Sequence, residues 1–258
     1  MWLKVRGKRA DGFHELETLF CEIDLADTII WYPGPGELKL TVTGAELGDA
    51  KDNLVIRAAE LFAAATGKRP CGSFHLEKSI PAGGGLGGGS SDAAGALHVF
   101  NKHFDAPLEY AELAKLAAEL GSDVPFFLLG GCCVGRGRGE ILEVTLPPED
   151  LASGWLLIPH IHISTAAVFG ALGPIDPSNR GPVAIGENDL LEPALAVSVE
   201  FRAVWRLLNI MLADMGELFM TGSGSTLVWL YDVEELPIWT IALFEKFQIT
   251  VVPFRLES

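Results

Sequence analysis

One glycine-rich stretch decides the fold class, and it reads Pro81-Ala82-Gly83-Gly84-Gly85-Leu86-Gly87-Gly88-Gly89-Ser90-Ser91-Asp92. Glycine loses more conformational freedom on folding than any other residue, so such a run is expected where a ligand must approach the backbone closely. The residues that follow predict a helix over 92–103, whose first N–H groups and dipole would face the loop. This arrangement is typical of a phosphate-binding site. The alternative is a flexible hinge or a tight packing turn.

The stretch departs from two known phosphate-binding fingerprints. A dinucleotide motif needs a buried strand and an acidic residue after its helix, and residues 101–104 before Asp105 do not form a strand pattern. A P-loop needs a lysine where Ser90 stands. We therefore expect phosphate binding of a third kind.

Composition excludes several classes of protein. The 258 residues carry 19 basic and 34 acidic side chains, a net charge of −15, and 49% are hydrophobic. A disordered chain would be less apolar, and a nucleic-acid partner would need a cationic surface. No apolar run reaches the length of a membrane span. The cysteines form no CxxC pair, which predicts reduced thiols in a cytoplasmic protein. No residues have metal-ligand spacing, so we expect no resident metal site.

Strand and helix patterns alternate along the chain, which favours an α+β or α/β fold. One helix should begin at Asn53 and end at Gly67, and a long helix is predicted over residues 190–214. The Pro147-Pro148 pair precedes a strong strand pattern. We therefore expect two domains, residues 1–150 and 151–258.

The central stretch, residues 81–91, resembles the phosphate-binding motif of the GHMP kinases. Three further segments narrow the resemblance to the 4-diphosphocytidyl-2-C-methyl-D-erythritol kinase family. Residues 7–16 read Gly-Lys-Arg-Ala-Asp-Gly-Phe-His-Glu-Leu, residues 120–127 read Leu-Gly-Ser-Asp-Val-Pro-Phe-Phe, and residues 220–226 are similar to the third GHMP motif. The four segments occur in family order and cover nearly the whole chain.

The resemblance implies an enzyme that phosphorylates the 2-hydroxyl of 4-diphosphocytidyl-2-C-methyl-D-erythritol with ATP, in the non-mevalonate pathway to isoprenoids. It implies an α+β fold with an N-terminal domain like the second domain of ribosomal protein S5 and a ferredoxin-like C-terminal domain. Mg²⁺ would accompany ATP, and the protein would be a monomer or weak homodimer with no nucleic-acid or membrane partner. The alternatives are another GHMP small-molecule kinase and a nucleotide-binding protein with impaired catalysis.

The resemblance also assigns the nucleotide and catalytic residues. Asp123 would accept the proton of the substrate hydroxyl, although an Asp ahead of an apolar run is also typical of a helix cap. Lys78 and Asn53 would line the ATP site, with a solvated lysine and an N-cap as the alternatives. The remaining ATP-binding residues would be Pro81, Ala82, Gly83, Gly84, Gly85, Leu86, Gly87, Gly88, Gly89, Ser90 and Ser91.

Four residues are assigned to the cytidyl substrate. Phe13, which replaces the family's usual tyrosine, would stack on cytosine, and His14 would bind the base by hydrogen bonds. Thr165 and Phe169 would contact the cytidyl end. The alternatives are core packing for Phe13, a turn histidine for His14, and a capping threonine with a helix-core phenylalanine for the last pair. The segment 222–224 would support the phosphate loop, and the alternative is a turn that leads into a strand.

The chain departs from the family at its beginning. The family opens with a strand that carries a lysine partner for the catalytic aspartate, and by register that lysine would precede Met1. Lys4 lies too far along the strand to replace it. We therefore expect that the chain lacks the first strand and turns over slowly, since losing one cationic group near the reacting oxygens typically costs ~10²–10³ in rate.

Overall fold

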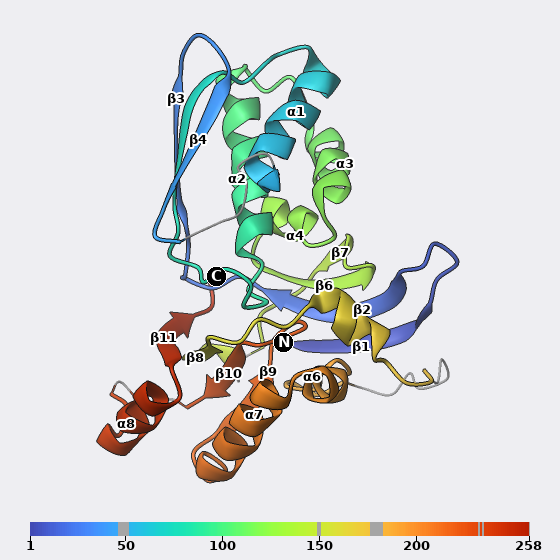
Figure 1. The fold of residues 1–258 in the computed structure, drawn as a ribbon. Coiled ribbons are helices and arrows are strands. Elements are labelled where there is room, and N and C mark those ends of the chain that lie inside the picture. The colour runs from blue at the N-terminus through green and yellow to red at the C-terminus, as the bar shows by residue number, and fades with distance from the viewer. Residues whose placement is uncertain (46–51, 149–150, 176–182, 232, 234, 258) are drawn as a thin grey trace. The chain divides into compact units, whose positions relative to one another are not determined.

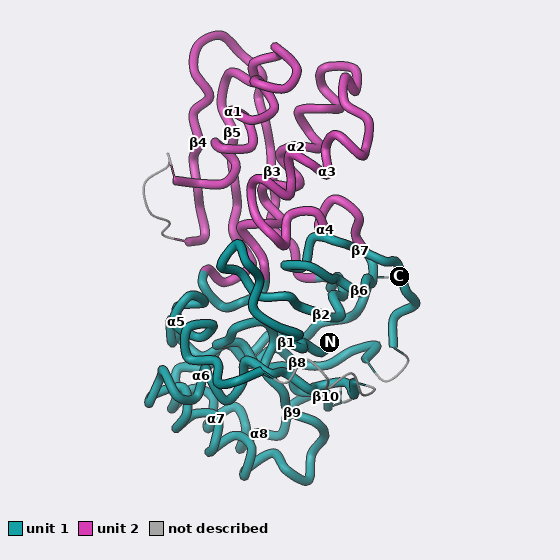
Figure 2. The backbone as a smooth tube through the Cα atoms, turned by 90° about the vertical axis from the view of Figure 1, so that its right-hand side faces the viewer, with its two compact units in different colours: residues 1–24, 83–86, 131–258 teal, residues 25–82, 87–130 magenta. Residues whose placement is uncertain are grey.

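The computed structural model describes residues 1–45, 52–148, 151–175, 183–231, 233 and 235–257 (Figure 1). Contacts divide the chain into two compact units, coloured separately in Figure 2. Unit 1 comprises Met1–Asp24, Gly83–Leu86 and Gly131–Ser258, and unit 2 comprises Leu25–Ala82 and Gly87–Gly130. This division differs from the boundary expected near residue 150, because the first strands pack with the C-terminal half of the chain.

A four-stranded antiparallel sheet joins the N-terminal strands to residues 132–144 within unit 1. Its strands, in the order β1-β2-β6-β7, are β1 (Trp2–Lys8), β2 (His14–Cys21), β6 (Cys132–Gly137) and β7 (Ile141–Val144). The register pairs Val5 with Leu16 and Leu16 in turn with Gly137. This pairing assigns residues 131–144 to the unit of the N-terminus.

The second sheet of unit 1 is also antiparallel, in the order β11-β8-β10-β9. Its strands are β8 (Ser153–Pro159), β9 (Glu217–Met220), β10 (Leu227–Leu230) and β11 (Ile249–Arg255), and the helices of the unit are α5 (Thr165–Gly170), α6 (Leu191–Val197), α7 (Val199–Met211) and α8 (Ile238–Lys246). Leu157, Phe201 and Trp229 lie fully buried in its core. The prediction of a single helix over 190–214 is wrong, because Ser198 adopts an extended conformation between α6 and α7. Its hydroxyl caps α7 by accepting a hydrogen bond from the Phe201 amide at 3.1 Å.

Unit 2 packs four helices beside a three-stranded sheet (Figure 1). The strands, in the order β3-β5-β4, are β3 (Thr28–Pro33), β5 (Gly72–Glu77) and β4 (Leu38–Thr43), and the helices are α1 (Leu54–Thr66), α2 (Gly88–His103), α3 (Tyr110–Leu120) and α4 (Val124–Leu129). Phe62, Phe74 and Phe100 fill its core. Helix α1 is capped by Asn53 and ends at Gly67 in the left-handed conformation, which confirms the predicted limits.

Helix α2 determines the position of the glycine stretch. It begins at Gly88, four residues earlier than the predicted start at Asp92, so Gly88 and Gly89 belong to its first turn. Strand β5 ends at Glu77, and the glycine loop is therefore the connection between a strand and the start of a helix. Within the described helices, none combines the length and apolar character that crossing a membrane requires.

Candidate active site

The first turn of α2 presents unpaired backbone donors. Gly87 occupies the cap position at φ 71° and provides no side-chain cap, while the Ser91 amide makes the first helical bond to the Gly87 carbonyl at 2.9 Å. The amides of Gly88, Gly89 and Ser90 donate no hydrogen bond to any residue that the structure describes. Such amides, together with the positive end of the helix dipole, can bind the oxygens of a phosphate.

Packing accounts for some of the loop glycines but not for all of them. A Cβ atom on Gly87 would lie 2.7 Å from the ring of Phe127, and one on Gly88 would lie 2.9 Å from its nearest side-chain neighbour. A Cβ atom on Gly89 would meet only Leu54, at the ordinary contact distance of 3.9 Å. The packing alternative therefore explains Gly87 and Gly88, whereas Gly89 has no structural need for glycine.

The first half of the loop contacts the third motif inside unit 1. A Cβ atom on Gly85 would lie 2.8 Å from the carbonyl oxygen of Gly224. The Thr226 amide donates to the Gly84 carbonyl at 3.3 Å. These contacts agree with the expectation that residues 222–224 support the phosphate loop.

Lys78 is buried and paired rather than solvated. Its ammonium donates to Asp92 at 2.8 Å and forms a second ion pair with Asp27. Burial raises the pKa of Asp92 to about 6, although the neighbouring ammonium favours the charged carboxylate. The sequence analysis missed Asp27, because no motif marks it and its partner Lys78 lies beyond three intervening strands and a helix.

Asp123 precedes the first residue of α4 but does not cap it with its side chain. The residue is exposed to solvent, and its carboxylate makes no hydrogen bond or ion pair with any described residue. Although the residue has a solvent-accessible surface, many protein atoms surround its carboxyl group, and this desolvation raises the pKa of Asp123 above its ordinary value. Helix α4 packs against α2. The capping alternative therefore does not apply, and the role of Asp123 as a proton acceptor stays a prediction.

The side-chain oxygen of Asn53 has a structural role. Its side-chain oxygen accepts a hydrogen bond from the Val55 amide at 2.9 Å, which is the predicted N-cap of α1. The side-chain nitrogen donates no hydrogen bond to the described residues. Asn53 therefore retains a free donor, and its role in ATP binding stays a prediction.

Phe13 projects from the turn between β1 and β2. The turn closes through a hydrogen bond from the Arg9 amide to the Phe13 carbonyl at 2.8 Å, and the Phe13 amide donates to Asp11 at 3.1 Å. The residue is 51% exposed, so core packing does not explain its aromatic ring. The Arg138 guanidinium lies 4.9 Å from the ring centroid, a cation–π contact that the sequence analysis missed.

The other predicted substrate residues form two pairs in unit 1. His14 stacks on Phe169 with ring centroids 5.2 Å apart, and the Thr165 hydroxyl lies 2.8 Å from that of Ser223. Ser164, not Thr165, caps α5. Desolvation, with a smaller contribution from the charge of Lys8, lowers the pKa of His14 and favours the neutral imidazole.

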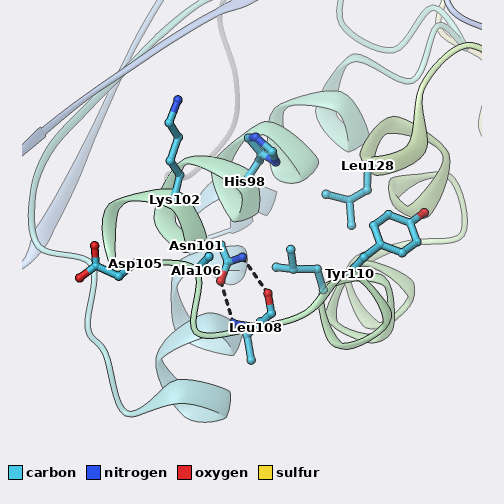
Figure 3. Close-up of a pocket in the computed structure, with 9 residues that line it drawn as sticks. His98, Asn101, Lys102, Asp105, Ala106, Leu108, Tyr110 and Leu128 are labelled. Carbon is cyan, nitrogen blue, oxygen red and sulfur yellow. Dashed lines mark hydrogen bonds between the residues drawn. The ribbon is translucent and has the colours of Figure 1, made fainter.

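A separate cavity of about 460 Å³ lies between α2, α3 and α4 (Figure 3). Its lining includes His98, Lys102 and Tyr110 but none of the predicted site residues, and the Lys102 side chain points away from Tyr110. Asn101 also lines the cavity, and its side-chain amide makes two hydrogen bonds with the backbone of Leu108. Among the described residues, no three His, Cys, Asp or Glu side chains are grouped to hold a metal ion.

Comparison with known proteins identifies the class. Residues 53–131 match the family described as GHMP kinases N terminal domain. A 4-diphosphocytidyl-2-C-methyl-D-erythritol kinase of Pelotomaculum thermopropionicum is 47% identical over 67% of this chain, and the match spans 60% of that protein. The corresponding kinase of Dechloromonas aromatica is 40% identical over 87% of this chain and 82% of its own. The crystal structure of a 4-(cytidine 5'-diphospho)-2C-methyl-D-erythritol kinase superposes with a TM-score of 0.79 at 32% identity, covering 100% of this chain and 96% of the other.

The protein is thus a GHMP kinase, a small-molecule kinase that uses ATP, and the predicted α+β fold of this class is confirmed. The likeness also reaches a narrower group, because the Dechloromonas relative is matched over most of both chains. The chain belongs to the 4-diphosphocytidyl-2-C-methyl-D-erythritol kinase family.

Proposed function

We propose that this protein transfers the γ-phosphoryl group of ATP to the 2-hydroxyl of 4-diphosphocytidyl-2-C-methyl-D-erythritol. The observation that carries the proposal is the state of Asp123, a solvent-exposed residue whose carboxylate is unpartnered among the described residues and raised in pKa by the protein atoms around it. These are the properties of a general base, because a base must reach its proton and works best when its pKa lies near the operating pH. The acceptor is the one named for the relatives.

In the proposed transfer, Asp123 accepts the proton of the substrate hydroxyl while the hydroxyl oxygen attacks the γ-phosphorus. The new oxygen–phosphorus bond forms as the bond from the γ-phosphorus to the bridging oxygen breaks, and ADP leaves with the electron pair. The free amides of Gly88, Gly89 and Ser90 would hold the phosphates in line and oppose their charge through the helix dipole.

Mg²⁺ fits this site as a companion of ATP. The hydroxyls of Ser90 and Ser91 make no hydrogen bond with the described residues, and both belong to the first turn of α2. Mg²⁺ in kinases keeps several waters and is bound mainly by substrate phosphates, so a cage of protein carboxylates is not required. Ser90 or Ser91 would supply a protein oxygen, and the ion would neutralise phosphate charge during transfer.

The cytidyl group would bind to the aromatic residues of unit 1. Phe13 offers an exposed ring for stacking, and base–aromatic stacking is worth ~1–3 kcal/mol. A neutral His14 carries one donor and one acceptor nitrogen, which suits the edge of a cytosine. Thr165 and Phe169 would complete this subsite through their contacts with Ser223 and His14.

An acceptor panel tests the proposal. Purified protein is incubated with Mg-ATP and either 4-diphosphocytidyl-2-C-methyl-D-erythritol, mevalonate or homoserine, and ADP release is measured together with the mass of the product. We expect turnover with the cytidyl substrate alone. Turnover with another acceptor would favour a different GHMP kinase, and ATP binding without turnover would favour a nucleotide-binding protein. Location in the cytoplasm and a monomeric or weakly dimeric state stay predictions.

A further inference from the structure

Three buried charged side chains surround the two ends of the glycine loop in unit 2. Asp27 precedes β3, Lys78 follows β5 and Asp92 lies in the second turn of α2. Their side chains are 2%, 4% and 4% exposed respectively. We call these three residues the loop clamp.

The clamp holds the chain immediately before the loop. One carboxylate oxygen of Asp27 accepts hydrogen bonds from the backbone amides of Ser79 at 2.6 Å and Ile80 at 2.8 Å. The other oxygen pairs with the Lys78 ammonium. A single buried carboxylate therefore binds both the backbone that enters the loop and the lysine beside it.

The clamp also holds the chain immediately after the loop. The Lys78 ammonium donates to Asp92 at 2.8 Å, which connects the end of β5 directly to α2. A Cβ atom on Gly88 would lie 3.1 Å from the Lys78 nitrogen, so the glycine makes room for the ammonium beside the first turn. The clamp and the free amides of that turn are thus adjacent parts of one arrangement.

Stability alone is a poor reason for such a cluster. A buried ion pair often contributes less than apolar residues of similar volume, because both charges lose their hydration. Here two carboxylates share one ammonium, and one oxygen of Asp92 is buried without a hydrogen-bond partner among the described residues. The cluster is therefore weak evidence of a stabilising role, and its contacts with both ends of the loop point to a role in the geometry of the loop.

We propose that Asp27 and Asp92 are positioning residues that act through Lys78 to hold both ends of the phosphate loop. The amides of Gly88, Gly89 and Ser90 then keep the direction in which a triphosphate needs them. Lys78 serves ATP binding by holding the loop, since two carboxylates occupy its ammonium. The inference rests on the ATP-binding role of the loop and is independent of the identity of the phosphoryl acceptor.

The test is the affinity for a non-hydrolysable ATP analogue, measured by calorimetry without any acceptor. Asp92→Ala removes the link across the loop and should weaken binding roughly tenfold, the scale of supporting-residue effects on a bound group. Asp92→Asn retains an oxygen that accepts from Lys78 and should restore most of the affinity. The KM for the cytidyl substrate should remain unchanged in both variants.

Asn101→Ala is the matched control, because Asn101 lies on the same helix and binds the Leu108 backbone at 2.9 and 3.1 Å at the opposite end. This substitution should lower the melting temperature without weakening the binding of the ATP analogue. If Asp92→Ala does not fold, Asp27→Ala carries the same expectation at the other end of the loop. The proposal is overturned if these variants bind the analogue as tightly as Asn101→Ala does, or if Asp92→Asn restores nothing. If the acceptor panel showed no turnover with the cytidyl substrate, the affinities for the ATP analogue would still test this proposal.

Discussion

The imidazole of His14 stacks on the ring of Phe169, with centroids 5.2 Å apart and ring planes inclined by 24°. The contact joins the first residue of β2 to the last turn of α5, two segments that are distant in the sequence. Both residues are predicted to contact the cytidyl substrate. Their contact means that each ring limits the orientations of the other.

A double-mutant cycle should detect this coupling. We expect His14→Ala and Phe169→Ala each to lower kcat/KM for the cytidyl substrate, and the double variant to lose less than the sum, because either deletion releases the remaining ring. Aromatic pairs typically couple by about 0.5–1.5 kcal/mol. The KM for ATP serves as the internal control and should stay constant. Strictly additive losses would show that the two rings act independently.

Asp123→Asn should abolish the base while leaving the fold intact. The amide cannot accept the hydroxyl proton, and loss of a general base typically lowers the rate by about 10²–10⁴-fold. We expect this loss in kcat, with unchanged affinity for ATP. The control is Asp105→Asn, the same exchange at an exposed position beyond the end of α2. A kcat for Asp123→Asn near that of the control would contradict the assigned role.

The pH profile should show a shifted acidic limb. Desolvation raises the pKa of Asp123 above its ordinary value of 3.8, so the carboxylate takes up a proton at a higher pH than a solvated aspartate does. Because the protonated form cannot accept the hydroxyl proton, kcat/KM for the acceptor should fall as the pH decreases through this raised pKa. The measurement is kcat/KM across the acidic range, which reports the pKa values of the free enzyme. An acidic limb near 3.8, or one that persists in Asp123→Asn, would refute this assignment.

Two neighbouring glycines should respond in opposite ways to alanine. In Gly89→Ala the new methyl group would meet only Leu54, at the ordinary contact distance of 3.9 Å, and alanine favours a helix over glycine by up to about 1 kcal/mol. We expect unchanged or higher stability but weaker ATP binding, because the methyl group intrudes on the ligand.

Gly87→Ala should instead lower the melting temperature. Its φ of 71° is unfavourable for alanine by about 1–2 kcal/mol, and its Cβ would lie 2.7 Å from Phe127. Thermal unfolding and nucleotide titration of both variants separate the two causes. Equal losses of stability would mean that Gly89 also serves packing.

Local signals predicted the elements that depend on neighbouring residues. The limits of α1 followed from Asn53 and Gly67, since a cap acts on amides within a few residues. The same signals failed at Ser198, where a hydroxyl that caps α7 interrupts an otherwise continuous apolar stripe. They also missed β9, a strand of four residues that acquires its partner only when β10 lies beside it.

The amino-acid sequence alone indicated a phosphate-binding loop, an α+β or α/β fold and the limits of α1, because glycines and caps act through short-range chemistry. The class of enzyme, the α+β fold and the candidate residues followed from the resemblance of its motifs to the GHMP kinases. Only the tertiary structure decided that Lys78 lies buried between Asp27 and Asp92, and that Arg138 covers the ring of Phe13. Burial and charge pairing arise where distant segments pack together. The residues next to a side chain in the sequence do not show which distant side chains will bury it or neutralise its charge.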